Sequence, residues 1–299
     1  MRVGFVGIGA MGGAMARRAL VDGLEVVVFD LDQAACSALA EKGAEVADSP
    51  SRLAERCDVV AVVVLNDQQV SHVVCGDDGL LAADKDALDI LIHSTIHLPT
   101  LLEVEERARA RGFCLIDAGV SGHITGAERG QLAVMVGGDE AVMKRCRPLL
   151  DTYGGLVMRM GPLGSGLKAK IARNLLSFAQ VAGIYEGMRV AEEAGIDLAA
   201  YAQIVRHSEA QSDLLDGFLS APSVREGNED TPDGRARLAL SKVVVETALK
   251  DLSAAIDLGR SLGLRLPVAE AAHSEVAGTW GAERGPTQPP TPQSQKQNH

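Results

Sequence analysis

Five short apolar runs, separated by stretches with helical periodicity, most restrict what the first half of this chain can fold into. They are rich in β-branched residues and show no polar alternation. Strands that are buried on both faces have this composition, and they occur in parallel sheets covered by helices. The repeated order strand, helix, strand therefore predicts an α/β fold with a doubly wound sheet. The runs cover residues 2–8, 25–30, 58–65, 88–94 and 113–121.

The sequence changes character near residue 162. Beyond this point it is rich in Ala, Leu and Glu with helical spacing, and we expect one long helix over 164–195 and a second over 239–263. The last residues are rich in Pro and Gln and have little to bury. The expected organisation is a doubly wound (Rossmann) sheet domain at 1–162, an all-α domain for substrate binding and dimerisation at 163–282, and a disordered tail at 283–299.

A glycine-rich turn follows the first apolar run. In "GFVGIGAMGG", Gly7, Gly9 and Gly12 have the spacing G-x-G-x-x-G. The next helix opens at Ala10 and Met11. In such a turn the first glycine permits the tight bend, the second lets the backbone approach a pyrophosphate, and the third lets helix and strand pack closely. The helix N-terminus adds N–H donors for phosphate groups, so the context favours a dinucleotide site over a glycine turn that binds nothing.

Asp30 indicates which dinucleotide is bound. It closes the second strand, where a carboxylate accepts hydrogen bonds from ribose hydroxyls and repels a 2′-phosphate. Leu31 supplies no guanidinium for such a phosphate. We therefore expect NAD as the cofactor, with NADP as the alternative because Arg18 and Lys42 could lie nearby.

Charge and cysteine usage argue against several kinds of partner. The 299 residues include 40 acidic and 29 basic ones, a net charge of −11, which repels nucleic acid and anionic membrane surfaces. No run of 18 apolar residues lacks charge or glycine, so we expect no membrane span.

The cysteines lack metal-binding spacing, and His93 and His97 flank a strand end, not a helix. We therefore expect no metal and a reducing, cytoplasmic location.

Four motifs, in order, resemble those of the β-hydroxyacid dehydrogenases. This family includes 3-hydroxyisobutyrate dehydrogenases and tartronate and succinic semialdehyde reductases. The resemblance covers nearly all of residues 1–280 and implies a Rossmann domain followed by helices. The motifs are the glycine turn, "DAGVSGHITGAERGQLAVMVGG" (117–138), "GSGLKAKIARN" (164–174) and "KDLSAAIDLGRSLGLRLPV" (250–268).

This resemblance implies an NAD(P)-dependent hydride transfer between nicotinamide and a small β-hydroxy acid or its semialdehyde, in a homodimer or homotetramer. It makes Lys170 the general acid/base and Asn174 its neighbour on the substrate. Lys168, two residues earlier, points to nearly the opposite helix face. On periodicity alone, Lys170 is a solvated helix lysine, and only the motif favours catalysis.

The resemblance also implies further contacts. Ser121 and Gly122 match the residues that hold the substrate carboxylate, and Asp251 belongs to a pair that closes over the cofactor. His123 either contacts the substrate or closes a loop. Matching positions for substrate are Ser121, Gly122, His123 and Thr95, and for cofactor Gly7, Gly9, Ala10, Met11, Gly12, Asp30, Leu65, Asn66, Thr95 with its neighbour Ser94, and Lys250.

The chain departs from the usual motifs at four positions. Gly119 replaces a proline, His123 a second glycine, Arg173 an asparagine, and Val243 an aromatic residue. We therefore expect a substrate that differs from plain 3-hydroxyisobutyrate in bulk or polarity. Two other functions stay open: an imine reductase-like enzyme, which usually has Asp or Tyr where Lys170 stands, and a non-catalytic dinucleotide-binding scaffold, which Lys170 argues against.

Overall fold

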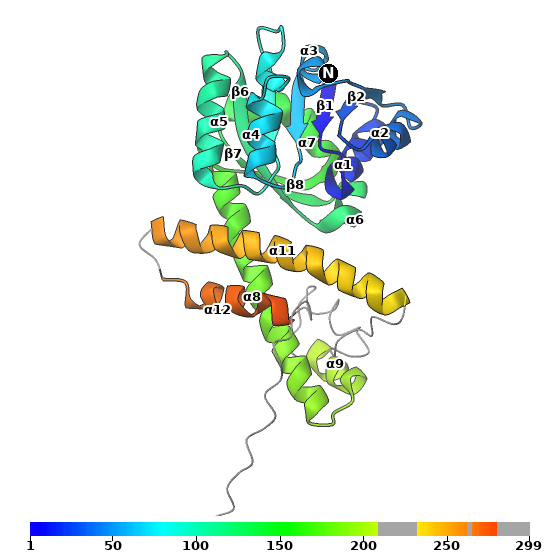
Figure 1. Ribbon diagram of the computed structural model, residues 1–299, viewed down its shortest axis with the longest axis vertical. Helices are drawn as coiled ribbons and strands as arrows, with labels where there is room; N and C mark the ends of the chain where they lie inside the picture. The colour runs from blue at the N-terminus through cyan, green and yellow to red at the C-terminus, as the bar shows by residue number, and fades with distance from the viewer. Residues whose placement is uncertain (209–231, 262–264, 280–299) are drawn as a thin grey trace, which may run out of the picture. The chain divides into compact units, whose positions relative to one another are not determined.

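The computed structural model describes residues 1–208, 232–261 and 265–279. It divides into two compact units, Met1–Arg173 and Asn174–His299. Helix α8 (Ser165–Glu193) starts in the first unit and continues in the second (Figure 1). The predicted domain boundary at residue 162 stays a prediction, and the tail at 283–299 lies outside the described residues.

An eight-stranded sheet forms the centre of the first unit, with the order β3-β2-β1-β4-β5-β6-β7-β8. All neighbouring strands are parallel except β6 and β7, which are antiparallel. The predicted doubly wound sheet is therefore confirmed. Its strands are β1 (Arg2–Val6), β2 (Glu25–Phe29), β3 (Glu45–Val46), β4 (Val59–Val62), β5 (Asp89–Ile92), β6 (Cys114–Ser121), β7 (Leu132–Gly137) and β8 (Gly154–Gly161).

Helices cover this sheet, and several begin at side-chain caps. Asp32, Ser49 and Asp139 each accept hydrogen bonds from backbone N–H groups that a helix start leaves unpaired. The helices are α1 (Ala10–Val21), α2 (Gln33–Ala40), α3 (Pro50–Arg56), α4 (Asp67–Cys75), α5 (Leu98–Ala110), α6 (His123–Glu128) and α7 (Glu140–Tyr153), with a 3-10 turn at Leu80–Ala82.

The core of the first unit lies between sheet and helices. Every residue of β4 and β5 is buried, and Phe5 of β1 and Met15 of α1 have no exposed surface. This explains why the sequence shows continuous apolar runs in place of alternation. The carboxyl ends of the parallel strands are consequently held at one rigid edge, where the loops carry the candidate site residues.

All described elements of the second unit are helices, which confirms the predicted order of a sheet domain followed by an all-α domain. They are α8, α9 (Leu198–Arg206), α11 (Pro232–Ser261) and α12 (Pro267–Thr279). Helix α8 matches the expected 164–195 closely. Helix α11 begins earlier than the predicted 239, because Pro232 stands in the first turn, where its fixed φ suits a helix start.

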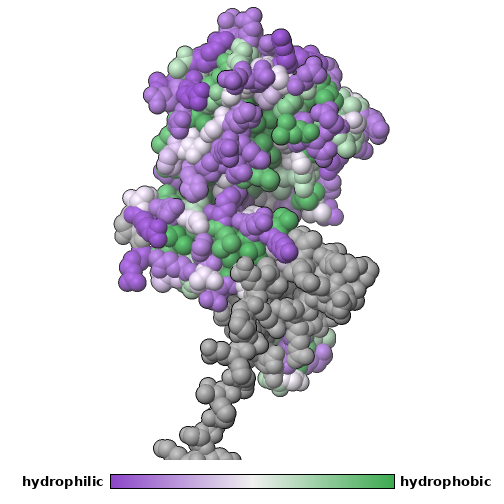
Figure 2. Space-filling view, in the orientation of Figure 1, coloured by the Kyte–Doolittle hydropathy of each residue, from purple (hydrophilic) through white to green (hydrophobic). Residues whose placement is uncertain are grey.

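Hydrophilic side chains cover much of the visible face of the first unit, with smaller hydrophobic areas between them (Figure 2). Two of the most exposed leucines are Leu31 at 88%, two residues after the end of β2, and Leu65 at 75%, three residues after the end of β4. Both therefore lie at the carboxyl edge of the sheet. Among the helices that the structure describes, none is both long enough and apolar enough to cross a membrane.

Candidate active site

The glycine turn between β1 and α1 has the geometry that its sequence predicts. Gly7 has φ of +85°, a conformation that favours glycine. A Cβ at Gly12 would collide with the carbonyl oxygen of Gly7, so α1 packs on the turn as closely as its backbone allows. A Cβ at Gly9, in contrast, would meet no atom within 4 Å. The second glycine therefore borders open space at the N-terminus of α1, which fits a pyrophosphate.

Asp30 ties this turn to the end of β2. Its Oδ2 accepts a hydrogen bond from the Ile8 N–H at 2.7 Å, and its Oδ1 accepts one from Asp32 at 2.9 Å. Arg18 is engaged elsewhere, because it pairs with Asp22 at 2.6 Å and donates to the Thr152 carbonyl at 3.1 Å. The carboxylate at Asp30 is thus fixed beside the glycine turn.

Hydrogen bonds join the loops that follow β4 and β5. Ser94 Oγ accepts from the Val64 N–H at 3.0 Å, and Asp67 Oδ1 accepts from the His97 N–H at 2.9 Å and the Thr100 hydroxyl at 2.6 Å. Burial raises the pKa of Asp67, but these hydrogen bonds outweigh it and lower the pKa below its usual value. Sequence reasoning missed Asp67, although it directly follows the predicted Leu65 and Asn66.

The predicted cofactor residues of these loops have different environments. Leu65 is exposed, while Thr95 is half-buried. The Asn66 side chain caps α4 by accepting from the Gln69 N–H at 2.9 Å. The Asn66 amide thus also has a structural role, which its place before an apolar helix signals.

The segment Ser121–Gly122–His123 ends β6 in an unusual backbone conformation. Gly122 has φ of +136° and His123 has φ of +59°. Among the residues that the structure describes, His123 is the only one other than glycine in the left-handed region. The usual second glycine at this position suits that backbone, whereas a histidine costs about 1 kcal/mol. His123 is exposed, directly after Ser121 and Gly122.

The two lysines at the start of α8 are clearly distinguished. Lys168 is exposed and Lys170 is half-buried. A Cβ built on Gly119 would lie 2.8 Å from Lys170 Cβ and 3.2 Å from its Cγ, so the lysine stem rests on the backbone of β6. Because side chains alternate along a strand, Ser121 lies on this same face. The structure thus brings Lys170 to the strand face that carries Ser121.

Asp117, at the beginning of the "DAGVSG" motif, is a second residue that sequence reasoning missed. Its carboxylate is 2% exposed and accepts hydrogen bonds from the N–H groups of Gly164 and Leu167, at the start of α8. Burial raises the pKa of Asp117, and the backbone donors act in the opposite direction. Asp117, the first residue of the motif at 117–138, therefore binds the helix that carries Lys170.

In the second unit, α8 and α11 bring Asn174 and Asp251 together. The Asn174 Nδ2 donates to Asp251 Oδ2 at 2.7 Å, and both residues are at most 5% exposed. Lys250 Nζ lies 3.6 Å from Asp251 Oδ1. Asp251 therefore orients the Asn174 amide. The departures Arg173 and Val243 are both exposed.

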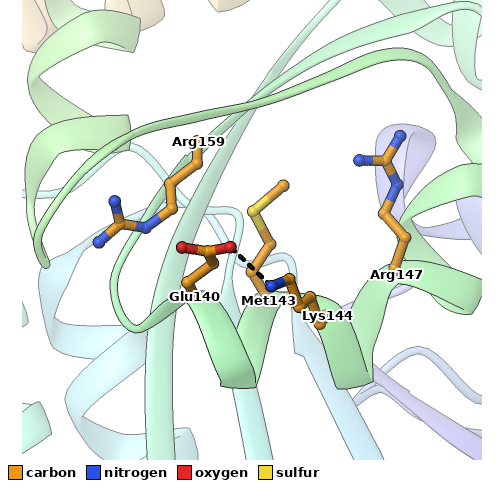
Figure 3. Close-up of a pocket in the computed structure, with 5 residues that line it drawn as sticks. All are labelled: Glu140, Met143, Lys144, Arg147 and Arg159. Carbon is orange, nitrogen blue, oxygen red and sulfur yellow. Dashed lines mark ion pairs between the residues drawn. The ribbon is translucent and has the colours of Figure 1, made fainter.

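A surface depression of about 380 Å³ is lined by side chains of α7 and β8 (Figure 3). Across the sheet, Gly119 of β6 is the strand partner of Met135 in β7, and Met135 is the strand partner of Met158 in β8. Arg159 is the next residue along β8 after Met158. Paired residues share a face and consecutive ones alternate, so Arg159 faces away from Lys170. The depression is therefore separate from the candidate site. Its lining residues are Glu140, Met143, Lys144, Arg147 and Arg159, with Lys144 and Glu140 paired at 2.7 Å.

Metal ligands do not cluster in the part of the chain that the structure describes. No group of three or more His, Cys, Asp and Glu side chains there could hold a metal ion. His93 has other partners, because its ring nitrogens contact the Ala118 carbonyl at 2.6 Å and the Tyr153 hydroxyl at 3.1 Å.

Known protein families match both the sheet domain and the helical domain of this chain. Residues 2–161 match the NAD-binding domain of 6-phosphogluconate dehydrogenase, and residues 164–285 match the NAD-binding domain of NADP-dependent 3-hydroxyisobutyrate dehydrogenase. A 3-hydroxyisobutyrate dehydrogenase of Pseudomonas aeruginosa is 36% identical over 222 residues, 74% of each chain.

Two solved structures are similar over most of their length. One is a 3-hydroxyisobutyrate dehydrogenase from Salmonella typhimurium, with a TM-score of 0.77, 29% identity and 93% of each chain covered. The other is a 3-hydroxyisobutyrate dehydrogenase of Mycobacterium tuberculosis with L-serine, with a TM-score of 0.75, 27% identity, and 93% of this chain and 92% of that one covered.

The fold, the glycine turn and these matches define an NAD(P)-dependent oxidoreductase with a Rossmann domain followed by a helical domain. The chain belongs to the β-hydroxyacid dehydrogenase family, and it is an NAD(P)-dependent hydroxyacid dehydrogenase.

Proposed function

We propose that Lys170 is the general acid/base of this dehydrogenase. The observation that carries the proposal is the position of its stem against Gly119, on the face of β6 that also carries Ser121. A base at this place takes the proton of the substrate hydroxyl during oxidation, and the protonated amine returns it to the alkoxide during reduction. Such a group contributes about 10²–10⁴-fold to the rate. The bound nicotinamide supplies the hydride acceptor or donor.

The substrate in this proposal is a small β-hydroxy acid or its semialdehyde. Ser121 and Gly122 hold its carboxylate, as the family motif implies, and Asn174 donates to its hydroxyl or carboxylate. The relatives include 3-hydroxyisobutyrate dehydrogenases, and one solved structure contains L-serine. His123 replaces a glycine with a polar ring, so the preferred substrate is more polar or bulkier than 3-hydroxyisobutyrate.

The proposed cofactor preference is NAD. Asp30 carries a negative charge beside the glycine turn, and Arg18 is occupied by Asp22 and Thr152. A 2′-phosphate is therefore repelled without compensation from that guanidinium. Gly7, Gly9, Gly12 and the N-terminus of α1 hold the pyrophosphate, and Leu65, Asn66, Thr95 and Lys250 take the cofactor positions that the family motifs imply.

We also infer a cytoplasmic homodimer or homotetramer. The cysteines Cys36, Cys57, Cys75, Cys114 and Cys146 are all free, and burial raises the pKa of Cys57 and Cys146 to about 12. Buried, protonated thiols of this kind suit a reducing compartment. The oligomeric state rests on the family resemblance, and size-exclusion chromatography with light scattering measures it directly.

The experiment that tests the catalytic assignment compares two lysines on one helix. Lys170→Ala should lower kcat by about 10²-fold or more, while NAD affinity stays nearly intact, because proton transfer and not pyrophosphate binding is lost. Lys168→Ala is the matched control, since its side chain is exposed two residues away, and it should be close to neutral.

Steady-state kinetics on a panel of hydroxy acids, with NAD and NADP, and titration of NAD into both variants give the result. Equal losses for both lysines, or an active Lys170→Ala enzyme, would overturn the assignment. If all hydroxy acids fail in the wild type but cyclic imines are reduced, the imine reductase alternative replaces it. Cofactor binding without any turnover would favour the scaffold alternative.

A further inference from the structure

We propose that Asp117 is a positioning residue for Lys170: its buried carboxylate fixes the first turn of α8 on the sheet and so determines where the lysine amine lies. The inference rests on the proposed function of Lys170. Asp117 itself does not contact the reacting atoms in this proposal. It acts through the backbone of the helix, and each link of that connection is visible in the first unit.

The first link is the pairing between Asp117 and the start of α8. Asp117 Oδ1 accepts from the Gly164 N–H at 2.6 Å, and Oδ2 accepts from the Leu167 N–H at 2.5 Å. The first N–H groups of a helix have no partner within the helix, so a carboxylate that binds them also determines where the helix begins. Both oxygens are used, and the side chain is 2% exposed.

The second link is close packing around this carboxylate. A Cβ on Gly137 would collide with Asp117 Oδ1, and a Cβ on Gly166 would lie 2.8 Å from Asp117 Oδ2 and 2.8 Å from the Gly137 nitrogen. The same Cβ on Gly166 would also collide with the Met135 carbonyl oxygen. The first turn of α8 is therefore in backbone contact with β7 and has no space to shift towards the sheet.

The third link leads from this turn to the lysine. Lys170 follows Leu167 by three residues, about 4.5 Å along the helix axis at 1.5 Å per residue. It follows Gly166 by four residues and so lies on the same helix face. Its stem rests on Gly119 of β6. The helix is thus held to the sheet at two successive turns, and a change at Asp117 moves the second contact as well as the first.

Replacing Asp117 by asparagine tests this connection with little change in volume. An amide has one acceptor oxygen, and its NH₂ group faces an N–H donor where the second carboxylate oxygen stood. One of the two helix N–H groups then loses its partner, and the turn shifts. A displacement of about 1 Å can cost up to about 10²-fold in rate, and we expect Asp117→Asn to lower kcat by about 10-fold with NAD affinity unchanged.

Asp89 offers a matched control in the same sheet. It is 8% exposed, and both of its oxygens accept from Arg145, at 2.7 and 2.8 Å. Asp89 pairs with Cys114 at the start of β6, whereas Asp117 pairs with Ile92 at the other end of β5. Asp89→Asn should therefore lower the melting temperature without lowering kcat, which separates loss of a buried carboxylate from displacement of Lys170.

A double-mutant cycle on kcat decides whether Asp117 acts through Lys170. In the Lys170→Ala background, Asp117→Asn should cost less than about 2-fold, because the group that it positions is gone. Equal fold-losses in both backgrounds, or wild-type kcat for soluble Asp117→Asn, would overturn the proposal. If Asp117→Asn is insoluble, Asp117→Glu carries the test, since it keeps the charge and displaces the turn by one methylene group.

The outcome is distinguishable from failure of the proposed function. If Lys170→Ala retains wild-type activity, the catalytic assignment is wrong and the cycle has no lysine effect to measure. If Lys170→Ala is inactive but Asp117→Asn has a normal kcat and a normal pH profile of kcat, only the positioning role is wrong. A shifted pH profile in Asp117→Asn, with Asp89→Asn unchanged, supports it.

Discussion

Gly9 and Gly12 lie in the same turn, yet the structure predicts opposite consequences for the same substitution. A methyl group at Gly12 meets the carbonyl oxygen of Gly7 and lies 3.1 Å from Val63 Cβ. A methyl group at Gly9 meets nothing within 4 Å, and the φ of −59° at Gly9 lies outside the left-handed region that favours glycine. Gly12→Ala should therefore destabilise the fold, whereas Gly9→Ala should leave it intact and weaken cofactor binding.

The magnitudes follow from these contacts. Relieving the collision at Gly12 requires α1 to move by about 1 Å, and overpacking of this kind costs about 1–3 kcal/mol. In a unit of this size, each kcal/mol lowers the melting temperature by about 2–4 °C, so we expect a decrease of about 2–12 °C. At Gly9 the methyl group occupies space that a pyrophosphate needs, and an affinity loss of about 10-fold corresponds to about 1.4 kcal/mol.

Thermal melting without cofactor and calorimetric titration with NAD measure the two effects separately. Gly9→Ala should melt like the wild type and bind NAD at least about 10-fold more weakly. Gly12→Ala should melt earlier. Wild-type NAD affinity in Gly9→Ala would refute the argument from open space, and a wild-type melting temperature in Gly12→Ala would refute the argument from packing.

Two further predictions concern histidines. His123→Gly relieves about 1 kcal/mol of left-handed backbone strain, which offsets the entropic cost of glycine. The free energy of unfolding measured in urea should therefore change by less than about 0.5 kcal/mol. Its kcat/KM values across hydroxy acids should nevertheless change in rank, and an unchanged ranking would contradict a substrate contact. Burial lowers the pKa of His93 from 6.5 to about 4. Between these values the unfolded chain binds a proton that the folded chain does not, so stability should fall by up to about 3 kcal/mol as pH decreases from 6.5 to 4. In His93→Gln, the free energy of unfolding measured in urea should decrease less than in the wild type over the same pH interval. An equal decrease in the two proteins would contradict the assignment to His93.

The sheet was predictable wherever a strand is buried on both faces. The runs at 2–8 and 88–94 contain β1 and β5, because continuous apolar sequence is typical of such strands. Strands β3, β7 and β8 were missed. In β8, Leu156 and Met158 are exposed, so this strand lacks the two-sided burial that produces a continuous apolar run in the sequence. The segment that joins β6 to β7 contains α6, and no local sequence pattern fixes the antiparallel pairing of these two strands.

The candidate site was predictable only in part, for a related reason. The glycine turn is local, and its spacing alone carries the geometry of Gly7 and Gly12. Asp117, in contrast, bonds a backbone N–H 47 residues later in the chain, and Asp67 bonds one 30 residues later. The sequence shows these carboxylates but not the donors that face them, because tertiary packing brings the two together.

The two departures in the β6 motif have opposite physical consequences. His123 introduces a side chain where the backbone favours glycine, whereas Gly119 removes one where the family has proline. Any Cβ at position 119 would lie 2.8 Å from Lys170 Cβ, so a proline there requires the lysine stem to move. Lys170 in this chain therefore rests closer to β6 than a residue with a Cβ allows. Because Asp117 holds the preceding turn of α8 on the same sheet, the space that this glycine leaves is filled by the proposed catalytic side chain itself.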